Sequence, residues 1–229
     1  MFSQKSRVEL GLQMLCFTAF YLVCFSALEA GAHSHYHTIG LWLDTQLPFL
    51  PFFIIPYFAW FGYIFVAVFW LLFYTKSYDE CCVCISSLMT GMTIFLLISA
   101  VYPNSLDIRP EITGTDIFSR LVAFLYRTDT PTNVFPSIHV FNTTVVCQSV
   151  IKNTQKRSVK IMNITLSVLI ILSTVFLKQH SVLDVIAGLI MAAGLRKAAE
   201  KIFEKEGEKE EGGVFSCAGS FGMLDTRQK

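Results

Sequence analysis

The sequence contains few charged residues and almost no excess of either sign. Of its 229 residues, 15% are charged and 53% are hydrophobic, and the formal net charge is +1. Soluble domains carry roughly a quarter charged residues, so one soluble core of this size could not bury so much apolar surface. The small net charge gives no electrostatic indication of a nucleic-acid partner. The sequence therefore predicts an integral membrane protein.

Long runs without a charged residue predict the membrane-spanning helices, because about 18 or more apolar residues are needed to cross the hydrocarbon layer. Pro48, Pro51 and Pro56 interrupt the second run, so its spanning part is expected nearer to 57–74. The sixth run is shorter and contains Asp184. The six runs are Leu10–Leu28, Thr45–Thr75, Cys81–Leu106, Thr130–Ile151, Ile161–Leu177 and Gln179–Leu195.

Lysines and arginines divide unevenly between the two sides of this predicted all-α bundle of six transmembrane helices. Of the 18 in the chain, the side that holds the loops after the first, third and fifth spans receives only Arg109, Arg120, Arg127 and Lys178. Short loops rich in Lys and Arg stay in the cytoplasm, so both termini are predicted to be cytoplasmic. The first run is too apolar and too long for a typical signal peptide, which favours an uncleaved helix. The expected location is the plasma membrane.

The C-terminal tail alternates lysine and glutamate from Arg196 to Glu211 at three- and four-residue spacings. This pattern predicts a solvated helical extension of the sixth span. From Gly212 onward nothing in the sequence predicts order. We therefore expect a six-helix membrane domain at 1–198 and a charged, partly disordered cytoplasmic tail at 199–229.

Cysteines are absent from the predicted outer loops, so the sequence does not indicate a disulfide framework. A group of three cysteines at 81–84 lies at the cytoplasmic edge of the third span, where inert thiols are favoured over lipidation. The first outer loop contains three histidines that could bind a metal, although a polar loop that happens to be rich in histidine is the simpler interpretation. They are His33, His35 and His37.

Three polar clusters, at 102–110, 133–139 and 178–184, fall on the same predicted outer face. Ionisable residues at membrane depth are costly and mark functional candidates. In the third cluster His180 and Asp184 are four residues apart and share a helix face. There the carboxylate can fix the imidazole tautomer and leave the other nitrogen free to attack or to take a proton. A structural His–Asp hydrogen bond at a helix start explains the pair equally well when it is taken alone.

The other two clusters supply groups that suit a phosphate. Pro136 fits the first turn of a helix, whose N-terminus presents free N–H groups to an anion. Ser137 adds a hydroxyl group, His139 can act as acid or base, and the Arg109 guanidinium matches phosphate oxygens. Each has an ordinary structural explanation on its own. Together they have the parts of a phosphoryl-transfer site. No further carboxylate forms a pair with Asp184 that would indicate a metal site. We therefore expect a metal-free phosphohistidine route without a cofactor.

The order Arg-Pro, Pro-Ser-x-His and His-x-x-x-Asp over residues 102–188 resembles the type 2 phosphatidic acid phosphatase superfamily, which has a six-helix core. The resemblance implies that His180 is the nucleophile and Asp184 its orienting partner. It also implies that His139 is the general acid for the leaving alcohol. The phosphoryl group would be bound by the remaining motif residues, Arg109 and Ser137.

The sequence departs from the family pattern at three positions. Tyr102 stands at the lysine position, Ile138 at the glycine position and Thr174 at the arginine position. Two family cations are therefore missing, and the loss of one such group can cost orders of magnitude in rate. The outer face offers two candidates to replace them, Lys178 and Arg127.

The substitutions indicate a particular branch of the superfamily. The stretch 135–140, with Asp44 and the segment 47–51, is similar to the branch that contains inositol phosphorylceramide synthases. The leading hypothesis is hydrolysis of a lipid phosphate or diphosphate at the outer leaflet, with the lipid and the membrane as partners. A lipid head-group phosphotransferase is the first alternative, since an alcohol can replace water. A non-catalytic membrane protein or transporter is the second, although no internal repeat is visible.

Overall fold

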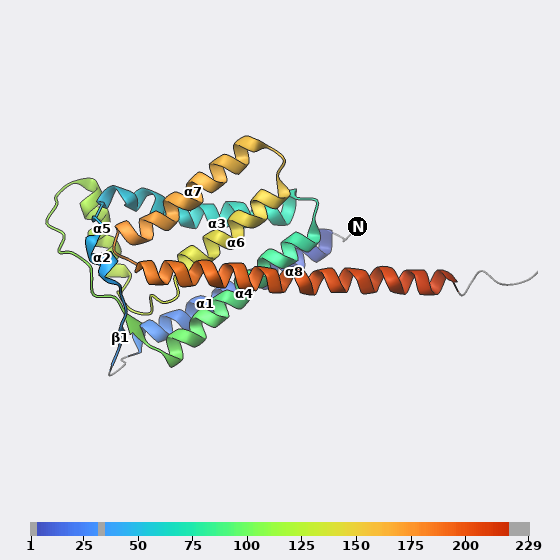
Figure 1. Cartoon of the computed structure of the whole chain (residues 1–229), viewed down its shortest axis with the longest axis horizontal. Coiled ribbons are helices and arrows are strands. Elements are labelled where there is room, and N and C mark those ends of the chain that lie inside the picture. The colour runs from blue at the N-terminus through green and yellow to red at the C-terminus, as the bar shows by residue number, and fades with distance from the viewer. Residues whose placement is uncertain (1–3, 32–34, 220–229) are drawn as a thin grey trace, which may run out of the picture.

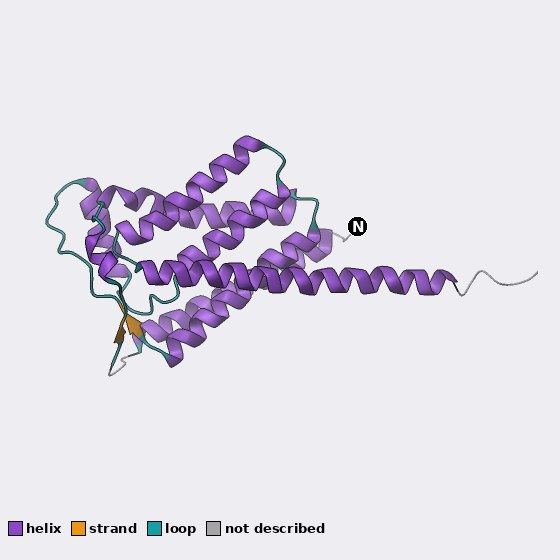
Figure 2. Ribbon diagram, in the orientation of Figure 1, coloured by secondary structure: helices purple, strands orange, loops and turns teal. Residues whose placement is uncertain are grey.

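The computed structural model describes residues 4–31 and 35–219 of the chain. It is mostly helical, with eight α-helices and one short parallel pair of strands in this part of the chain (Figure 2). The helices are α1 (Gln4–Ala30), α2 (Trp42–Gln46), α3 (Ile54–Tyr74), α4 (Tyr78–Val101), α5 (Ile117–Thr128), α6 (Ile138–Asn153), α7 (Arg157–Phe176) and α8 (Val182–Gly219), and the strands are β1 (His37–Thr38) and β2 (Asn104–Ser105).

Four of the described helices are long and apolar enough to cross a membrane. They correspond to the first, second, third and fifth runs of the sequence. Neither α6, which has 16 residues, nor α8 is among them, so spans in these two helices stay predictions. The four apolar helices extend over Arg7–Ala30, Pro51–Tyr74, Tyr78–Val101 and Arg157–Phe176.

The helix α6 lies at the centre of the bundle and packs against α3, α4, α7 and α8. Two glycines permit close approach to it. A Cβ atom on Gly91 of α4 would lie 2.0 Å from the ring of Phe141, and one on Gly188 of α8 would lie 2.8 Å from the backbone oxygen of Ser137. Neither position has room for a side chain. The contact at Gly188 holds the start of α8 against the start of α6, where two of the polar clusters lie.

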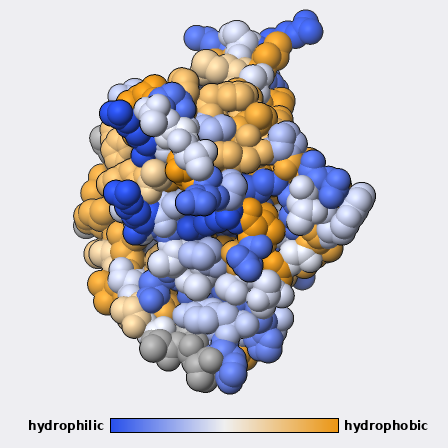
Figure 3. Space-filling model, turned by 90° about the vertical axis from the view of Figure 1, so that its left-hand side faces the viewer, coloured by the Kyte–Doolittle hydropathy of each residue, from blue (hydrophilic) through white to orange (hydrophobic). Residues whose placement is uncertain are grey.

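The two ends of the bundle differ in their connections. The described N-terminus and the protruding part of α8 lie at one end, whereas α2, α5 and β1 lie at the other (Figure 1). In the space-filling view toward this second end, hydrophilic atoms gather in the middle and hydrophobic atoms flank them (Figure 3). The three polar clusters of the sequence belong to this end, which we call the loop end.

The outer loop after the third run contains a helix that the sequence analysis did not predict. This helix is α5, which Asp116 caps by accepting hydrogen bonds from the N–H groups of Phe118 (2.9 Å) and Ser119 (3.2 Å). An amphipathic helix of 12 residues is too short to be found by a search for spans. In the fourth run the helix begins at Ile138, close to the start that Pro136 predicted.

The second run agrees with its prediction more closely. A single 3-10 turn, η1 (Pro51–Phe53), precedes α3, and Pro56 lies in the first turn of α3. Proline is tolerated there because the N–H groups of the first turn have no helical acceptor. The prolines therefore end the irregular segment and do not break the helix.

At the end opposite the loop end, α4, α6 and α8 are joined by ionic and hydrogen-bonded contacts that we call the ion cluster. Arg196 contacts Glu80 and donates to the Ser149 hydroxyl (2.6 Å), which in turn donates to Glu80 (2.8 Å). Lys152 pairs with Glu80 (3.4 Å) and with Glu200 (2.8 Å). Glu80 and Arg196 are buried, and each has a partner of opposite charge.

The helix α8 continues without a break from the bundle into the charged tail. It passes Glu211, where the alternating charges end, and stops at Gly219. The remaining tail residues, 220–229, and His33 of the histidine group lie outside the described residues. His37 belongs to β1, which pairs with β2. The six cysteines between residues 16 and 147 are free thiols.

Candidate active site

The turn between α7 and α8 positions His180 and Asp184. The backbone N–H groups of Gln179 and His180 both donate to the oxygen of Thr174, at 2.9 and 3.0 Å, which folds the turn tightly. Asp184 Oδ2 accepts from the backbone N–H of Ser181 (2.8 Å) and lies 3.5 Å from His180 Nδ1. His180 and Asp184 are both buried. The structure thus brings the predicted nucleophile and its orienting carboxylate together.

Asp44 of α2 attaches the N-terminus of α8 to the rest of the loop end. It is fully buried, and its carboxylate accepts from the Ser181 hydroxyl (2.6 Å) and the Val182 backbone N–H (2.8 Å). The carboxylate therefore supplies the acceptors that a helix N-terminus requires. Asp44 fixes the turn that carries His180, although it does not line the cavity described below.

Lys178 binds the segment that contains α2. Its ammonium donates to the backbone oxygens of Asp44 and Leu47, at 2.6 Å each. Burial lowers the pKa of Lys178, and the Asp44 carboxylate opposes that shift. Because its donors point at the α2 segment, Lys178 does not face His180 in this structure. It fixes the turn in the way that Asp44 does.

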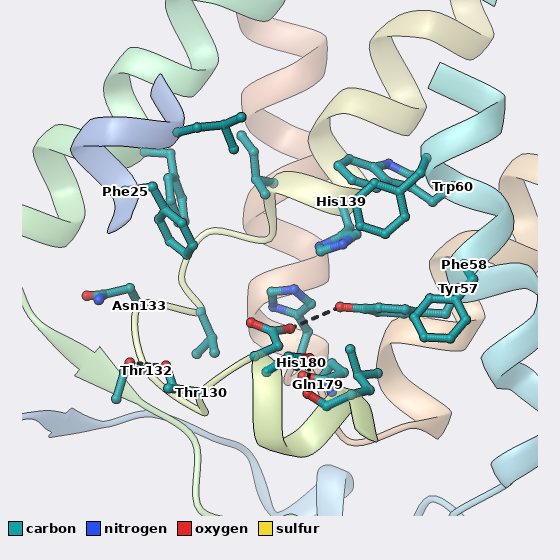
Figure 4. A pocket seen from close by; sticks show the side chains of 18 of the residues that line it. Phe25, Tyr57, Phe58, Trp60, Thr130, Thr132, Asn133, His139, Gln179 and His180 are labelled. Carbon is teal, nitrogen blue, oxygen red and sulfur yellow. Dashed lines mark hydrogen bonds between the residues drawn. The ribbon is translucent and has the colours of Figure 1, made fainter. Parts of the chain in front are cut away.

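The start of α6 brings His139 to His180. Ser137 caps α6 by accepting from the Val140 N–H (3.4 Å), and its own N–H donates to the backbone oxygen of Asp184 (3.1 Å). This second bond joins the beginning of α6 to that of α8. The ring centroids of His139 and His180 are consequently 5.7 Å apart, and both rings face one space (Figure 4).

Aromatic rings of α3 surround His139. Its ring lies 4.3 Å from that of Trp60 and 4.9 Å from that of Tyr57, measured between centroids. Its Nδ1 atom is buried and has no hydrogen-bond partner among the described residues. His180 Nδ1 makes no hydrogen bond within the same part of the chain, but it lies 3.5 Å from Asp184 Oδ2, so the atom of this pair that lacks any partner there is His139 Nδ1. Unpaired buried polar atoms are rare in folded proteins and indicate a site for a ligand or for water.

The two histidines line a cavity of about 490 Å³. Its walls are mainly aromatic and aliphatic side chains of α1, α3, α4 and α5, and polar groups gather at the end near His180 (Figure 4). Leu22, Phe61 and Phe124 of this lining are 55%, 60% and 59% exposed, so the cavity reaches the outer surface of the bundle. Its polar lining consists of Tyr57, Thr128, Asp129, Thr130, Thr132, Asn133, His139, Gln179 and His180.

Arg109 stands behind this lining. Its guanidinium donates to the backbone oxygens of Asp129 (2.7 Å) and Thr130 (3.2 Å) and to Gln179 Oε1, and it lies 4.6 Å from the ring centroid of Tyr126. Burial lowers the pKa of Arg109, and the Asp129 carboxylate opposes the shift. Arg109 therefore fixes two lining segments and reaches the cavity only through Gln179.

The remaining predicted cation and the residue at the lysine position lie elsewhere. Arg127 is exposed on α5, and Tyr102 stacks on His37 with ring centroids 4.3 Å apart. Neither lines the cavity. The structure thus gathers His139, His180 and Asp184 with the Ser137 cap, and leaves the two proposed replacements for the missing family cations outside.

Gln179 and Asp129 are among the cavity residues that received no role in the sequence analysis. Gln179 is buried. Its Oε1 atom accepts a hydrogen bond from Arg109, and its Nε2 atom has no partner among the described residues. Asp129 accepts a hydrogen bond from the Tyr57 hydroxyl (3.2 Å), drawn as a dashed line in Figure 4. The signal for Asp129 was its place four residues before the second cluster. Only the fold shows that it faces His180.

The segment that carries Asp129 is held by Glu29 at the end of α1. The Glu29 carboxylate contacts the Thr130 hydroxyl and accepts from the Thr132 hydroxyl (3.1 Å) and the Asn133 amide (2.7 Å). Asn104 supports the next residues by accepting from two backbone N–H groups of the loop that precedes α6. The polar end of the cavity is therefore built from contacts between distant segments, several of them partly buried.

Comparison with known families agrees with this geometry. Residues 107–207 match the family model described as the PAP2 superfamily. This segment, which is less than half of the chain, is similar to that superfamily. The match includes His139 and His180, which line the cavity, and Asp184, which lies behind His180. No curated protein and no solved structure gives a significant match to the chain. The similarity to the PAP2 superfamily, with four apolar helices, supports a membrane protein with phosphatase-type lipid phosphoesterase or related activity.

Proposed function

We propose that the chain is a membrane lipid phosphatase that hydrolyses a lipid phosphate or diphosphate monoester through a phosphohistidine on His180. The observation that carries this proposal is the pair of histidine rings 5.7 Å apart, facing one largely apolar cavity. One ring has a carboxylate behind it and the other does not. This asymmetry supports His180 as the nucleophile and His139 as the acid.

The reaction then proceeds in two steps. The unprotonated nitrogen of His180 that faces the cavity attacks phosphorus, the new P–N bond forms, and the P–O bond to the lipid breaks. His139 gives its proton to the leaving lipid oxygen. In the second step water attacks phosphorus, its proton passes to His139, and the electron pair of the P–N bond returns to His180. Asp184 stabilises the positive charge that develops on His180.

Gln179 supports the transferring phosphoryl group. Arg109 holds its Oε1 atom, which leaves the Nε2 donor free at the cavity lining. A fixed donor aimed at developing negative charge stabilises the transition state without reorganisation. We propose that Arg109 acts through Gln179, in place of a direct contact with phosphate.

A six-span arrangement fits the packing. The helices α6 and α8 run within the bundle beside the four apolar helices, and the described N-terminus lies at the same end as the protruding part of α8. With the Lys- and Arg-rich loops in the cytoplasm, the loop end and its cavity face the outer leaflet of the plasma membrane. The exposed lining residues of α1, α3 and α5 would then admit an acyl or prenyl chain from the bilayer.

The decisive measurement is phosphate release by the purified protein from phosphatidic acid, a sphingoid phosphate and a polyprenyl diphosphate, in buffer with EDTA. The proposal expects release from at least one lipid, loss of it in His180→Ala, and a ³²P label on the wild-type protein that is stable to alkali. Release that depends strictly on a divalent cation would contradict the mechanism. Release only after an alcohol acceptor is added would identify a head-group transferase.

A further inference from the structure

The charge of the cavity is unusual for a site that binds a phosphate. None of its lining residues is a lysine or an arginine. Lys178 directs its donors to backbone oxygens, and the two terminal nitrogens of Arg109 donate to backbone oxygens and to Gln179. The buried Arg109 Nε has no hydrogen-bond partner among the described residues, but Arg109 is not part of the cavity lining. The lining does include one carboxylate, that of Asp129. Apart from the histidines, its ionisable groups therefore favour a cation, although the chemistry of the site requires an anion.

The carboxylate of Asp129 is fixed in place and lacks an ion-pair partner within the described part of the chain. Its backbone N–H donates to the oxygen of Leu125 (2.8 Å), and its backbone oxygen accepts from Arg109 (2.7 Å). The guanidinium thus bonds the main chain of Asp129, and the carboxylate accepts from the Tyr57 hydroxyl. Partly buried carboxylates are normally paired, so a cationic ligand would satisfy this one.

Aromatic rings complete the surroundings of this carboxylate. Tyr57 and Trp60 lie on one side of the cavity and Phe25 on the other (Figure 4). Ring faces attract ammonium groups by about 0.5–2 kcal/mol, most strongly where water is excluded. A carboxylate beside aromatic walls is the usual chemistry of an ammonium site.

We propose that the cavity selects lipids in which an ammonium group is joined by a two-carbon link to the phosphoester oxygen, with Asp129 pairing with the ammonium. The proposal rests on the proposed function, because it places the phosphorus at His180. Asp129 and His180 line the same cavity, so a short link can connect their two ligands. The ammonium supplies the positive charge that the family's missing cations would otherwise provide.

Sphingoid base 1-phosphates and phosphatidylethanolamine are two kinds of lipid that contain this unit with a primary ammonium group. In the monoester, the P–O bond to the sphingoid alcohol breaks, and His139 protonates that oxygen. In the diester, the bond to diacylglycerol breaks in the same manner, and the phosphoethanolamine stays on His180 until water releases it. Acetylation of the nitrogen removes the charge from either lipid and leaves the phosphorus unchanged, which gives two matched pairs of substrates.

The test compares kcat/KM of the purified full chain for each amine and its N-acetyl derivative in mixed micelles. We expect at least a tenfold preference for the free amine in one pair, and the pair that shows it identifies the source of the ammonium. Asp129→Asn should reduce this preference to less than threefold, since the amide carries no charge but keeps an acceptor for Tyr57. The matched control is Asp107→Asn, an exposed carboxylate outside the cavity lining, which should leave the preference unchanged.

A binding measurement separates this inference from the proposed function. The dissociation constants of a fluorescent sphingoid base 1-phosphate and of its N-acetyl form are measured on His180→Ala, which cannot turn them over. Tighter binding of the amine, lost on adding Asp129→Asn, supports the ammonium site even if the wild type releases no phosphate. Equal binding and equal kcat/KM within every pair would overturn it, even if the protein is an active phosphatase.

Discussion

The two ends of the bundle treat buried polar groups in opposite ways. In the ion cluster, Glu80, Arg196 and Ser149 bond to one another. At the loop end, His139 Nδ1 and Gln179 Nε2 have no partner within the described chain. Buried polar groups that are all paired stabilise a fold, whereas unpaired ones are costly unless a ligand completes them. The comparison separates a part of the molecule built for stability from a part built for chemistry.

The largest expected effect is loss of the nucleophile. His180→Ala should lower kcat by at least about 10⁴-fold, since removal of a catalytic nucleophile has effects of that order. Its thermal unfolding in detergent should stay within a few degrees of wild type. Phosphate release and unfolding are measured on the same preparation. A variant that keeps near-native release would show that His180 is not the covalent residue.

At the ion cluster we expect a substitution to lower stability and to leave activity unchanged. Glu80→Ala leaves Arg196 buried without its main partner, and breaking a buried pair costs about 3–5 kcal/mol. The free energy of unfolding in detergent should fall by that amount, with activity per folded molecule unchanged. Lys152→Ala is the matched control, since Lys152 is 58% exposed and should cost less than about 1 kcal/mol. A large loss of kcat at normal stability would remove the distinction between the two ends.

A smaller catalytic effect is expected from Gln179. Replacing it by Leu removes the free Nε2 donor and should lower kcat by about 10²-fold, as for a single oxyanion-hole donor. Gln179→Glu keeps the contact with Arg109 but adds a negative charge, and it should be slower still. A change in KM alone, with kcat preserved, would place Gln179 in ground-state binding.

The smallest effect is a pH dependence of substrate choice. Burial raises the pKa of Asp129, while Arg109, His180 and Tyr57 oppose that shift and Glu29 adds to it. An aspartate with a raised pKa loses its charge at a higher pH than usual, so the preference for an amine over its N-acetyl form should fall as the pH is lowered. In Asp129→Asn the preference should not vary with pH. A wild-type preference that rises on acidification would exclude this assignment.

The sequence predicted the parts of the site that follow from local spacing. His180 and Asp184 lie close together as their spacing predicted, although His180 lies in the turn before α8 and not on the helix itself. Ser137 caps α6, since serine next to a proline commonly begins a helix. The four apolar helices followed from run length alone. These are short-range properties, and the fold did not alter them.

The direction of side chains at the loop end could not be predicted in this way. Lys178 and Arg109 were expected at the phosphate, but backbone oxygens of distant segments bind their donors. Asp129 faces the cavity because Arg109 and the end of α5 fix its main chain. Such contacts join residues far apart in the sequence. They depend on a tertiary arrangement that no local pattern encodes.

The contacts made by Asp44 indicate whether one part of the chain could form the site without the rest. The segment that matches the PAP2 superfamily begins at residue 107, yet the cap of α8 comes from Asp44 and the ring next to His139 comes from Trp60. The recognisable half of the chain is therefore not a module that could be moved into another protein. A fragment starting at 107 should be inactive alone, and co-expression of 1–106 should restore it. The motifs proposed to be catalytic lie after residue 106, and residues before it contribute contacts to their site.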